Sequence, residues 1–195
     1  MRAAGGSAQA VTGDGANESD AARFVAATEE QGLLELVLHN AGSNRRDAFL
    51  ELDAGDFEML WREHCLGGFL TGREARGAWC RGAGAQSFSP VQPAHYAEVR
   101  ALRLLPPPEK AGLRATAQSM ARELGPKGIH VAHIVIDCGI EGGRLLSAFP
   151  GRQNQKGPEG LLPIEAIADT YWQLHEQQRS AWTHEMDLRP WSERF

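Results

Sequence analysis

The side chains best suited to bind a metal or to attack a substrate in this 195-residue sequence are its seven histidines and three cysteines. The histidines show no H-x3-H spacing and the cysteines no C-x2-C spacing, which are the spacings that place two ligands on one metal ion. Cys65, Cys80 and Cys138 lie far apart and are odd in number, which argues against a disulfide framework and favours a reduced cytoplasm. We therefore expect no metal site and a cytoplasmic location, and we expect Cys138 to be an unreactive buried thiol.

Composition excludes several classes of protein. With 42% hydrophobic and 23% charged residues the chain can bury a core, and its length suits a single domain. A net charge of −5 provides no basic surface for nucleic acid. No apolar run approaches the ~18 residues of a membrane span, and residues 1–15 lack the charged and apolar regions of a secretory signal. We expect a domain that binds neither nucleic acid nor membrane.

The elements that must position any site alternate between helix and strand. Short apolar runs at 33–38 and 129–136 are typical of parallel strands that are buried on both faces. The pattern predicts helices from about 19 to Gly32, at 53–76, at 110–124 and at 164–176, and further strands at 8–11 and 182–188. This alternation predicts an α/β fold, in which a parallel sheet is covered by helices on both faces.

Residues 79–109 break this pattern. The segment holds five of the ten prolines and shows no clear period. It lies between two predicted helices, where another strand is expected. Because a structureless loop of about 30 residues is unusual inside a compact domain, we expect 79–109 to be an irregular insertion in one incomplete domain that spans 1–195.

Four segments carry a resemblance to one family. Residues 36–42 read L-V-L-H-N-A-G, 61–70 read W-R-E-H-C-L-G-G-F-L, and 110–131 and 180–191 follow in the same order. Together they resemble the short-chain dehydrogenase/reductase family, whose N-N-A-G turn, catalytic-lysine helix and C-terminal strand they match. The resemblance implies an NAD(P)-dependent oxidoreductase that acts on a small carbonyl or alcohol substrate.

The resemblance also implies where the cofactor, NAD or NADP, would lie. The residues that match the family's cofactor-contacting positions are Asp14, Asn40, Ala41, Gly42 and Ile140. The family's glycine-rich turn, T-G-x3-G-x-G, does not precede the N-A-G motif here. We therefore expect a partial doubly wound, Rossmann-like parallel sheet in which the first βαβ unit is missing.

The family's catalytic set is incomplete in this sequence. Lys110 matches the lysine of the family's Y-x3-K motif, but Pro106 stands in the tyrosine position and Pro93 in the serine position. His64 falls in the position of the family's helical asparagine and is the remaining titratable group. The alternatives are that Lys110 reaches solvent at the start of a helix, and that His64 and His39 are ordinary packing or surface residues.

The genetic code offers an explanation for 79–109. Codons that encode residues 86–110, read from the third base of each, permit a sequence close to A-I-L-F-T-G-A-T-G-A-L-R-G-G-A-G-F-A-A-F-A-S-A, which resembles the family's missing strand and loop. We hypothesise that this segment is translated in a shifted frame, which sequencing of the gene tests. In that frame Leu105 can become Phe but not Tyr.

Two functions remain open at this point. One is an oxidoreductase that is impaired or inactive as the chain stands. The other is a non-catalytic pseudoenzyme or relic that acts only through partner binding. The resemblance implies a homo-oligomer built on helices 53–76 and 110–124, with Leu113, Ala117 and Met120 as a candidate contact face.

Overall fold

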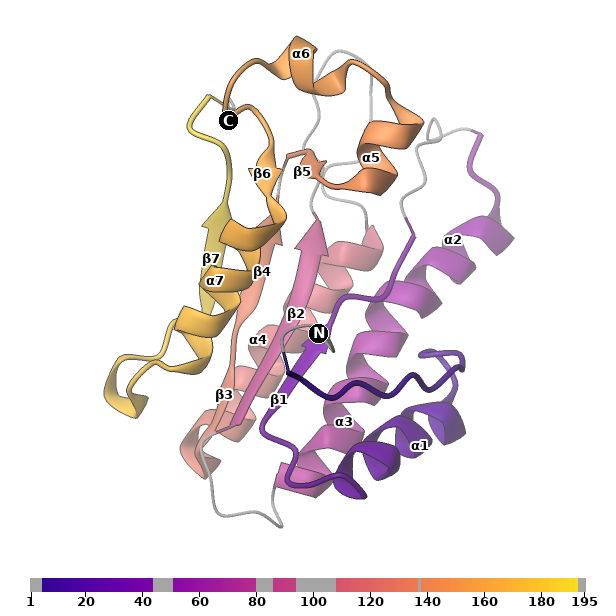
Figure 1. The fold of residues 1–195 in the computed structure, drawn as a ribbon. Coiled ribbons are helices and arrows are strands. Elements are labelled where there is room, and N and C mark those ends of the chain that lie inside the picture. Colours follow the sequence, from indigo (N-terminus) through magenta and orange to yellow (C-terminus); the bar gives the residue numbers. More distant parts are fainter. Residues whose placement is uncertain (1–4, 44–50, 80–85, 94–107, 137, 193–195) are drawn as a thin grey trace.

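The centre of the protein is a parallel sheet. The computed structural model describes residues 5–43, 51–79, 86–93, 108–136 and 138–192 (Figure 1). The sheet order is β1-β2-β4-β7, with β3 beside β2, and each of these pairs is parallel. The strand bounds are Leu36–His39 for β1, Gln86–Pro93 for β2, Ile129–Val131 for β3, His133–Ile136 for β4 and Glu185–Leu188 for β7. Strands β5 (Ile140–Glu141) and β6 (Leu162–Pro163) form a separate small parallel pair.

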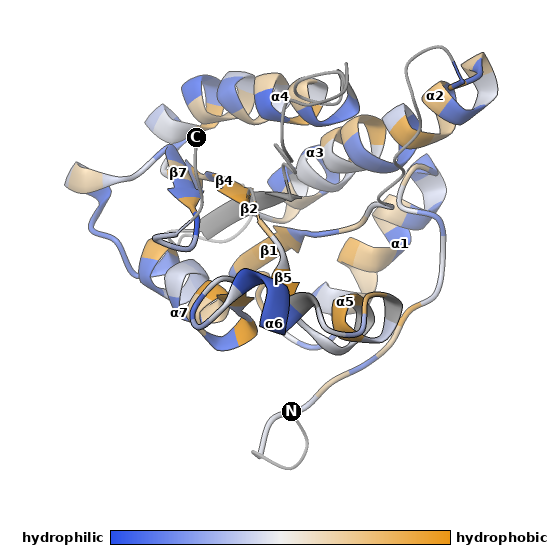
Figure 2. Ribbon diagram, turned by 90° about the horizontal axis from the view of Figure 1, so that it is seen from above, coloured by the Kyte–Doolittle hydropathy of each residue, from blue (hydrophilic) through white to orange (hydrophobic). Residues whose placement is uncertain are grey.

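Helices cover both faces of the sheet. Seen from above, α3 (Gly67–Trp79) and α4 (Pro108–Leu124) lie on one face and α7 (Ile164–His175) on the other (Figure 2). α1 (Glu18–Glu29) packs against α3. α2 (Ala54–Trp61) continues through the π-helical turn η2 (Arg62–Leu66) into α3. The shorter helices are η3 (Gly125–Lys127), α5 (Gly143–Ala148), α6 (Arg152–Lys156) and η4 (Arg179–Ala181).

Each face of the sheet has its own core, because side chains alternate along a strand. Ile129 and Val131 of β3 join a cluster with α3 and α4, whereas Ile134 and Ile136 of β4 join a cluster with α7. The first cluster is Leu34, Ala75, Ala78, Trp79, Ala117, Leu124, Ile129 and Val131. The second is Ala132, Ile134, Ile136, Cys138, Leu162, Tyr171 and Leu174. β3 and β4 are therefore buried on both faces, as the apolar run at 129–136 predicts.

Helix caps explain where two of the helices begin. The Asn17 side chain accepts hydrogen bonds from the backbone amides of Ser19 and Asp20 at the start of α1. Asp53 caps α2 in the same way, with its carboxylate accepting from the Asp56 amide at 2.8 Å. The expected helix at 53–76 is thus confirmed at its start, although the structure interrupts it with η2.

The parallel sheet with helices on both faces is confirmed, as are the strands near 33–38, 129–136 and 182–188. Two expectations are wrong. Residues 8–11 form no strand. Residues 86–93 are not irregular, because they form β2 between β1 and β3–β4, where parallel neighbours on both sides outweigh the weak local β propensity. The parts of the segment at 80–85 and 94–107 lie outside the described residues.

Candidate functional site

The site is built around the turn that follows β1. Asn40, Ala41 and Gly42, here called the 40–42 turn, are all exposed at the carboxyl end of the strand. Gly42 has a φ of 151°, a conformation that favours glycine. A Cβ atom added there would lie 2.1 Å from Cε1 of His64, so a larger residue would require the ring to move. The turn and the His64 ring therefore pack directly on one another.

His64 reaches the turn from the π-helical turn η2. Such turns are uncommon and are frequent at functional sites. The side chain is buried, and its Nε2 lies 2.8 Å from the backbone carbonyl oxygen of Ser43. Burial lowers the pKa of His64 and outweighs the raising effect of the hydrogen bond to the Ser43 backbone. The nearby Lys110 ammonium lowers the pKa further, against the charges of Glu109 and Glu63. The imidazole is therefore neutral at pH 7.

Lys110 lies in the first turn of α4 and faces the same region. Its residue is only 2% exposed, so the interpretation that it reaches solvent is wrong. The cause is the close packing of α4 on η2, where a Cβ added to Gly112 would lie 2.8 Å from Sγ of Cys65. Glu109, beside Lys110, is also buried. The structure thus brings Lys110, His64 and the 40–42 turn together.

His39, the last residue of β1, lies beneath this cluster. It is buried against the start of α3, 3.4 Å from the position that a Cβ on Gly67 would take. Burial lowers the pKa of His39 to about 4, and its ring is hydrogen-bonded to the backbone of His64. His39 and His64 are therefore both interior residues, which agrees with the alternative that they are packing residues. His64 differs from His39 in that it also borders the exposed turn.

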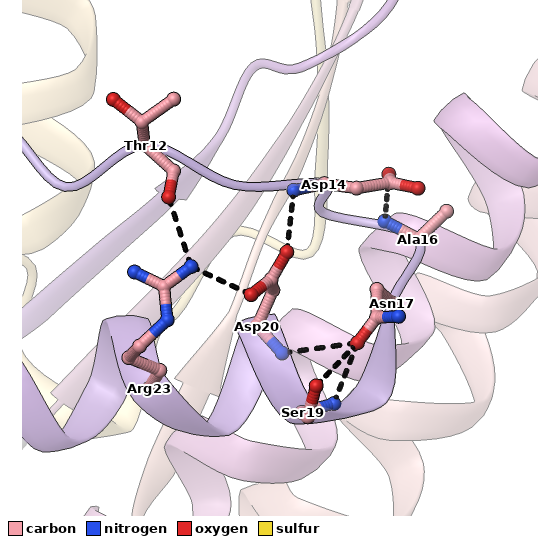
Figure 3. A network of polar contacts seen from close by, with 7 residues as sticks. All are labelled: Thr12, Asp14, Ala16, Asn17, Ser19, Asp20 and Arg23. Carbon is pink, nitrogen blue, oxygen red and sulfur yellow. Dashed lines mark hydrogen bonds and ion pairs between the residues drawn. The ribbon is translucent and has the colours of Figure 1, made fainter.

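Asp14 lies in the loop before α1, and hydrogen bonds hold this loop against the helix (Figure 3). Its Oδ1 accepts from the Ala16 amide, and its own amide donates to Oδ2 of Asp20, both at 2.8 Å. Nη2 of Arg23 bridges Oδ1 of Asp20 and the carbonyl oxygen of Thr12. The loop also touches η2, because Nη2 of Arg62 lies 3.5 Å from the Ala16 carbonyl oxygen.

Ile140 lies beyond the carboxyl end of β4, in β5, where it pairs with Leu162. It packs against the α7 core cluster, on the face of the sheet opposite α4. Cys138 is buried in the same cluster, which confirms the expectation of a buried thiol. Ile140 therefore follows the carboxyl end of β4, whereas Asp14 lies in the loop that precedes α1.

Sequence reasoning missed Ser43, which directly follows the turn, and Glu63, which binds Ser43. The Ser43 amide and hydroxyl both donate to Oε2 of Glu63, the amide at 3.0 Å. Twenty residues separate the pair, so no helix or strand period in the sequence could have indicated the contact.

Of the two prolines that stand in the family's catalytic positions, Pro93 ends β2, while Pro106 lies outside the described residues.

A hollow of about 730 Å³ lies near β5, β6 and α6, away from this cluster. Glu141, Glu159 and the exposed Trp191 line part of it, and neither Lys110 nor His64 does.

Within the described residues, no group of three His, Cys, Asp or Glu side chains is arranged to hold a metal ion. No helix in that part of the chain is both long and apolar enough to cross a membrane.

Comparison with known proteins identifies the family. The sequence model of the family described as Enoyl-(Acyl carrier protein) reductase matches residues 1–138. A short-chain dehydrogenase from Rhodopseudomonas palustris is 33% identical, with a TM-score of 0.76 over 97% of this chain and 78% of that one.

Two more distant structures share the fold. A putative gluconate dehydrogenase from Agrobacterium tumefaciens is 19% identical, with a TM-score of 0.80 over 97% of this chain and 77% of that one. A short-chain dehydrogenase from Mycobacterium paratuberculosis bound to NAD is 18% identical, with a TM-score of 0.76 over 97% and 75%. These neighbours bear out the partial Rossmann-like α/β fold. With its family motifs and its match to the Rhodopseudomonas enzyme, the chain belongs to the short-chain dehydrogenase/reductase family.

Proposed function

We propose that this protein is an NAD(P)-dependent oxidoreductase for a small carbonyl or alcohol substrate, with catalysis that is impaired in the chain as it stands. The observation that carries the proposal is the burial of Lys110 and His64 beside the exposed 40–42 turn. A cation and a neutral imidazole at the carboxyl edge of a parallel sheet lie where ligands bind in open α/β folds. Family membership supports the same reaction class.

The described residues fit one half of the cofactor. The 40–42 turn presents exposed backbone without a bulky side chain at Gly42, which suits the nicotinamide ribose, and Ile140 supplies an apolar contact for the carboxamide end. Asp14 is proposed to lie near the adenine. The N-terminus of α1 is a poor binding site for the pyrophosphate. Asn17 already caps that helix, and Glu18 and Asp20 place negative charge in its first turn.

When bound, NAD(P) supplies or accepts the hydride. The role proposed for Lys110 is to hold positive charge near the substrate oxygen, and the role proposed for His64 is to exchange a proton through Nδ1. Proline in the tyrosine and serine positions, Pro106 and Pro93, removes the family's acid and its hydroxyl partner. Because general acid–base help is worth roughly 10²–10⁴-fold in rate, turnover is expected to be slower by about that factor.

Titration with two reduced nicotinamides tests this proposal. NADH and reduced nicotinamide mononucleotide, which lacks the adenylate half, should bind with affinities within about threefold, because the pyrophosphate contributes little here. Lys110→Ala should weaken both equally, and Lys127→Ala, an exposed lysine in η3, should change neither. Absence of binding by both nucleotides would overturn the proposal.

The second candidate is a non-catalytic protein that acts through association. The two prolines at catalytic positions favour it. Large apolar side chains also remain exposed on α2 and α3, and we propose that they form a contact between copies of the chain: Phe57, Met59, Trp61 and Phe69.

We also propose, separately, that residues 79–109 are translated in a shifted frame, since this would explain both prolines at once.

A further inference from the structure

Ser43 is held at three points by two consecutive residues of η2. Its amide and its hydroxyl both donate to Oε2 of Glu63, and its carbonyl oxygen lies 2.8 Å from Nε2 of His64. Ser43 follows Gly42 directly, so the three contacts anchor the end of the 40–42 turn. Hydrogen bonds to an ionised carboxylate are about twice as strong as neutral ones.

The contact at the Ser43 carbonyl determines which nitrogen of His64 carries hydrogen. A carbonyl oxygen only accepts, so Nε2 must be the donor. In the neutral ring Nδ1 then has the lone pair. The Cε1 edge of the ring faces Gly42, and Nδ1 is the nearer nitrogen, at 2.4 Å against 2.8 Å for Nε2 from the position that a Cβ on Gly42 would take. The other tautomer would place two acceptors face to face at 2.8 Å.

Glu63 contacts Ser43 and does not touch the 40–42 turn itself. If its carboxylate were removed, Ser43 would lose two of the three contacts, and its carbonyl oxygen would no longer be fixed beneath Nε2 of His64. We propose that Glu63 is a positioning residue that holds Ser43 in place and so keeps His64 in the tautomer whose Nδ1 faces the 40–42 turn. This inference rests on the proposed function, because it assigns His64 its orientation for proton exchange.

Nitrogen NMR of the unliganded protein tests the inference directly. Glu63→Ala should turn His64 from the Nε2–H form into a mixture of tautomers, and should raise the exchange rate of the Ser43 amide about tenfold, as expected for the loss of a net ~1.4 kcal/mol hydrogen bond. Glu63→Gln retains a carbonyl acceptor and should restore the tautomer at least in part. Glu58→Ala, an exposed glutamate on α2, is the matched control and should change neither signal.

Two further comparisons keep the outcomes separate. Where Glu63→Ala does not fold, Ser43→Ala removes the hydroxyl contact alone and should give a smaller shift in the same direction. An unchanged His64 tautomer and unchanged Ser43 exchange in folded Glu63→Ala would overturn the inference. NADH titration of the same samples is read independently: a tautomer that depends on Glu63, with no nucleotide bound by any variant, would overturn the proposed function but not the positioning role.

Discussion

At the scale of single residues, Gly42 and His64 form the tightest contact of the candidate site. The Gly42 backbone has a φ that favours glycine, and the His64 ring occupies the space that a side chain would need. Gly32 provides a natural comparison, because its φ of 155° is nearly the same while nothing lies within 4 Å of its missing Cβ. Comparing substitutions at Gly32 and Gly42 therefore separates the cost of backbone strain from the cost of steric overlap with His64.

Gly42→Ala should destabilise the protein more than Gly32→Ala. Both changes incur backbone strain of about 1–2 kcal/mol, and overpacking against His64 adds roughly 1–3 kcal/mol at position 42 alone. The free energy of unfolding in urea measures both. The double variant Gly42→Ala/His64→Ala should recover the overpacking part, as expected for residues in contact. Equal losses for the two single variants would show that His64 does not press on the turn.

At the scale of elements, an ion pair between α4 and β7 lies beside a buried histidine of β4. His133 of β4 is fully buried, and its Nδ1 lies 3.6 Å from Oε2 of Glu185 in β7, too far for an ordinary hydrogen bond. Nε of Arg114 in α4 bonds the same carboxylate oxygen at 2.7 Å, and this contact is the main cause that lowers the pKa of Glu185. Burial lowers the pKa of His133 to about 4, because the charge of Glu185 does not offset the loss of water.

Stability should therefore fall as the pH falls. The unfolded histidine takes up a proton below about pH 6.5, whereas His133 in the folded protein does so only near pH 4, so the unfolded state binds more protons between these values. The full effect of His133 is about 3 kcal/mol, lost progressively as the pH falls from about 6.5 to about 4. Urea unfolding across this range measures it.

A matched pair of variants isolates this histidine. His133→Leu should reduce the pH dependence, and by more than His175→Gln, which changes a partly exposed histidine on α7. His39, whose pKa burial also lowers to about 4, continues to contribute in both variants. If the free energy of unfolding of His133→Leu depends on pH as steeply as that of the wild-type protein, His133 is not the titrating group.

At the scale of the whole molecule, the structure changes which surface is available for association. Leu113 and Ala117 are 1% and 0% exposed, so the expectation that they face a second copy is wrong. Leu113 packs on Gly68 of α3, and Ala117 belongs to the core cluster of α3, α4 and β3. Met120 packs partly against the same core. The large apolar side chains exposed nearby are instead on α2 and α3, with Phe57 and Trp61 one helical turn apart.

The proposed self-association should depend on this α2–α3 surface. Trp61→Glu places a charge among exposed apolar groups that a second copy would cover, so it should lower the sedimentation coefficient to that of a monomer. Trp172→Glu, at an even more exposed tryptophan on α7, is the control and should leave assembly unchanged. A monomeric wild-type chain, or an unaffected Trp61→Glu, would exclude the α2–α3 surface as the contact.

The sequence by itself determined the features that depend on neighbouring residues. The apolar run at 129–136, the Asp53 cap and the motif at Asn40 are local signals, and with the other local patterns they sufficed for the α/β class, the longer helices and the family. Only the tertiary structure decided that 86–93 is a strand, since its stability comes from partners on both sides rather than from its own residues. The same holds for the burial of Lys110 and for the contact of Ser43 with Glu63, because packing joins groups whose separation along the chain leaves no periodic trace.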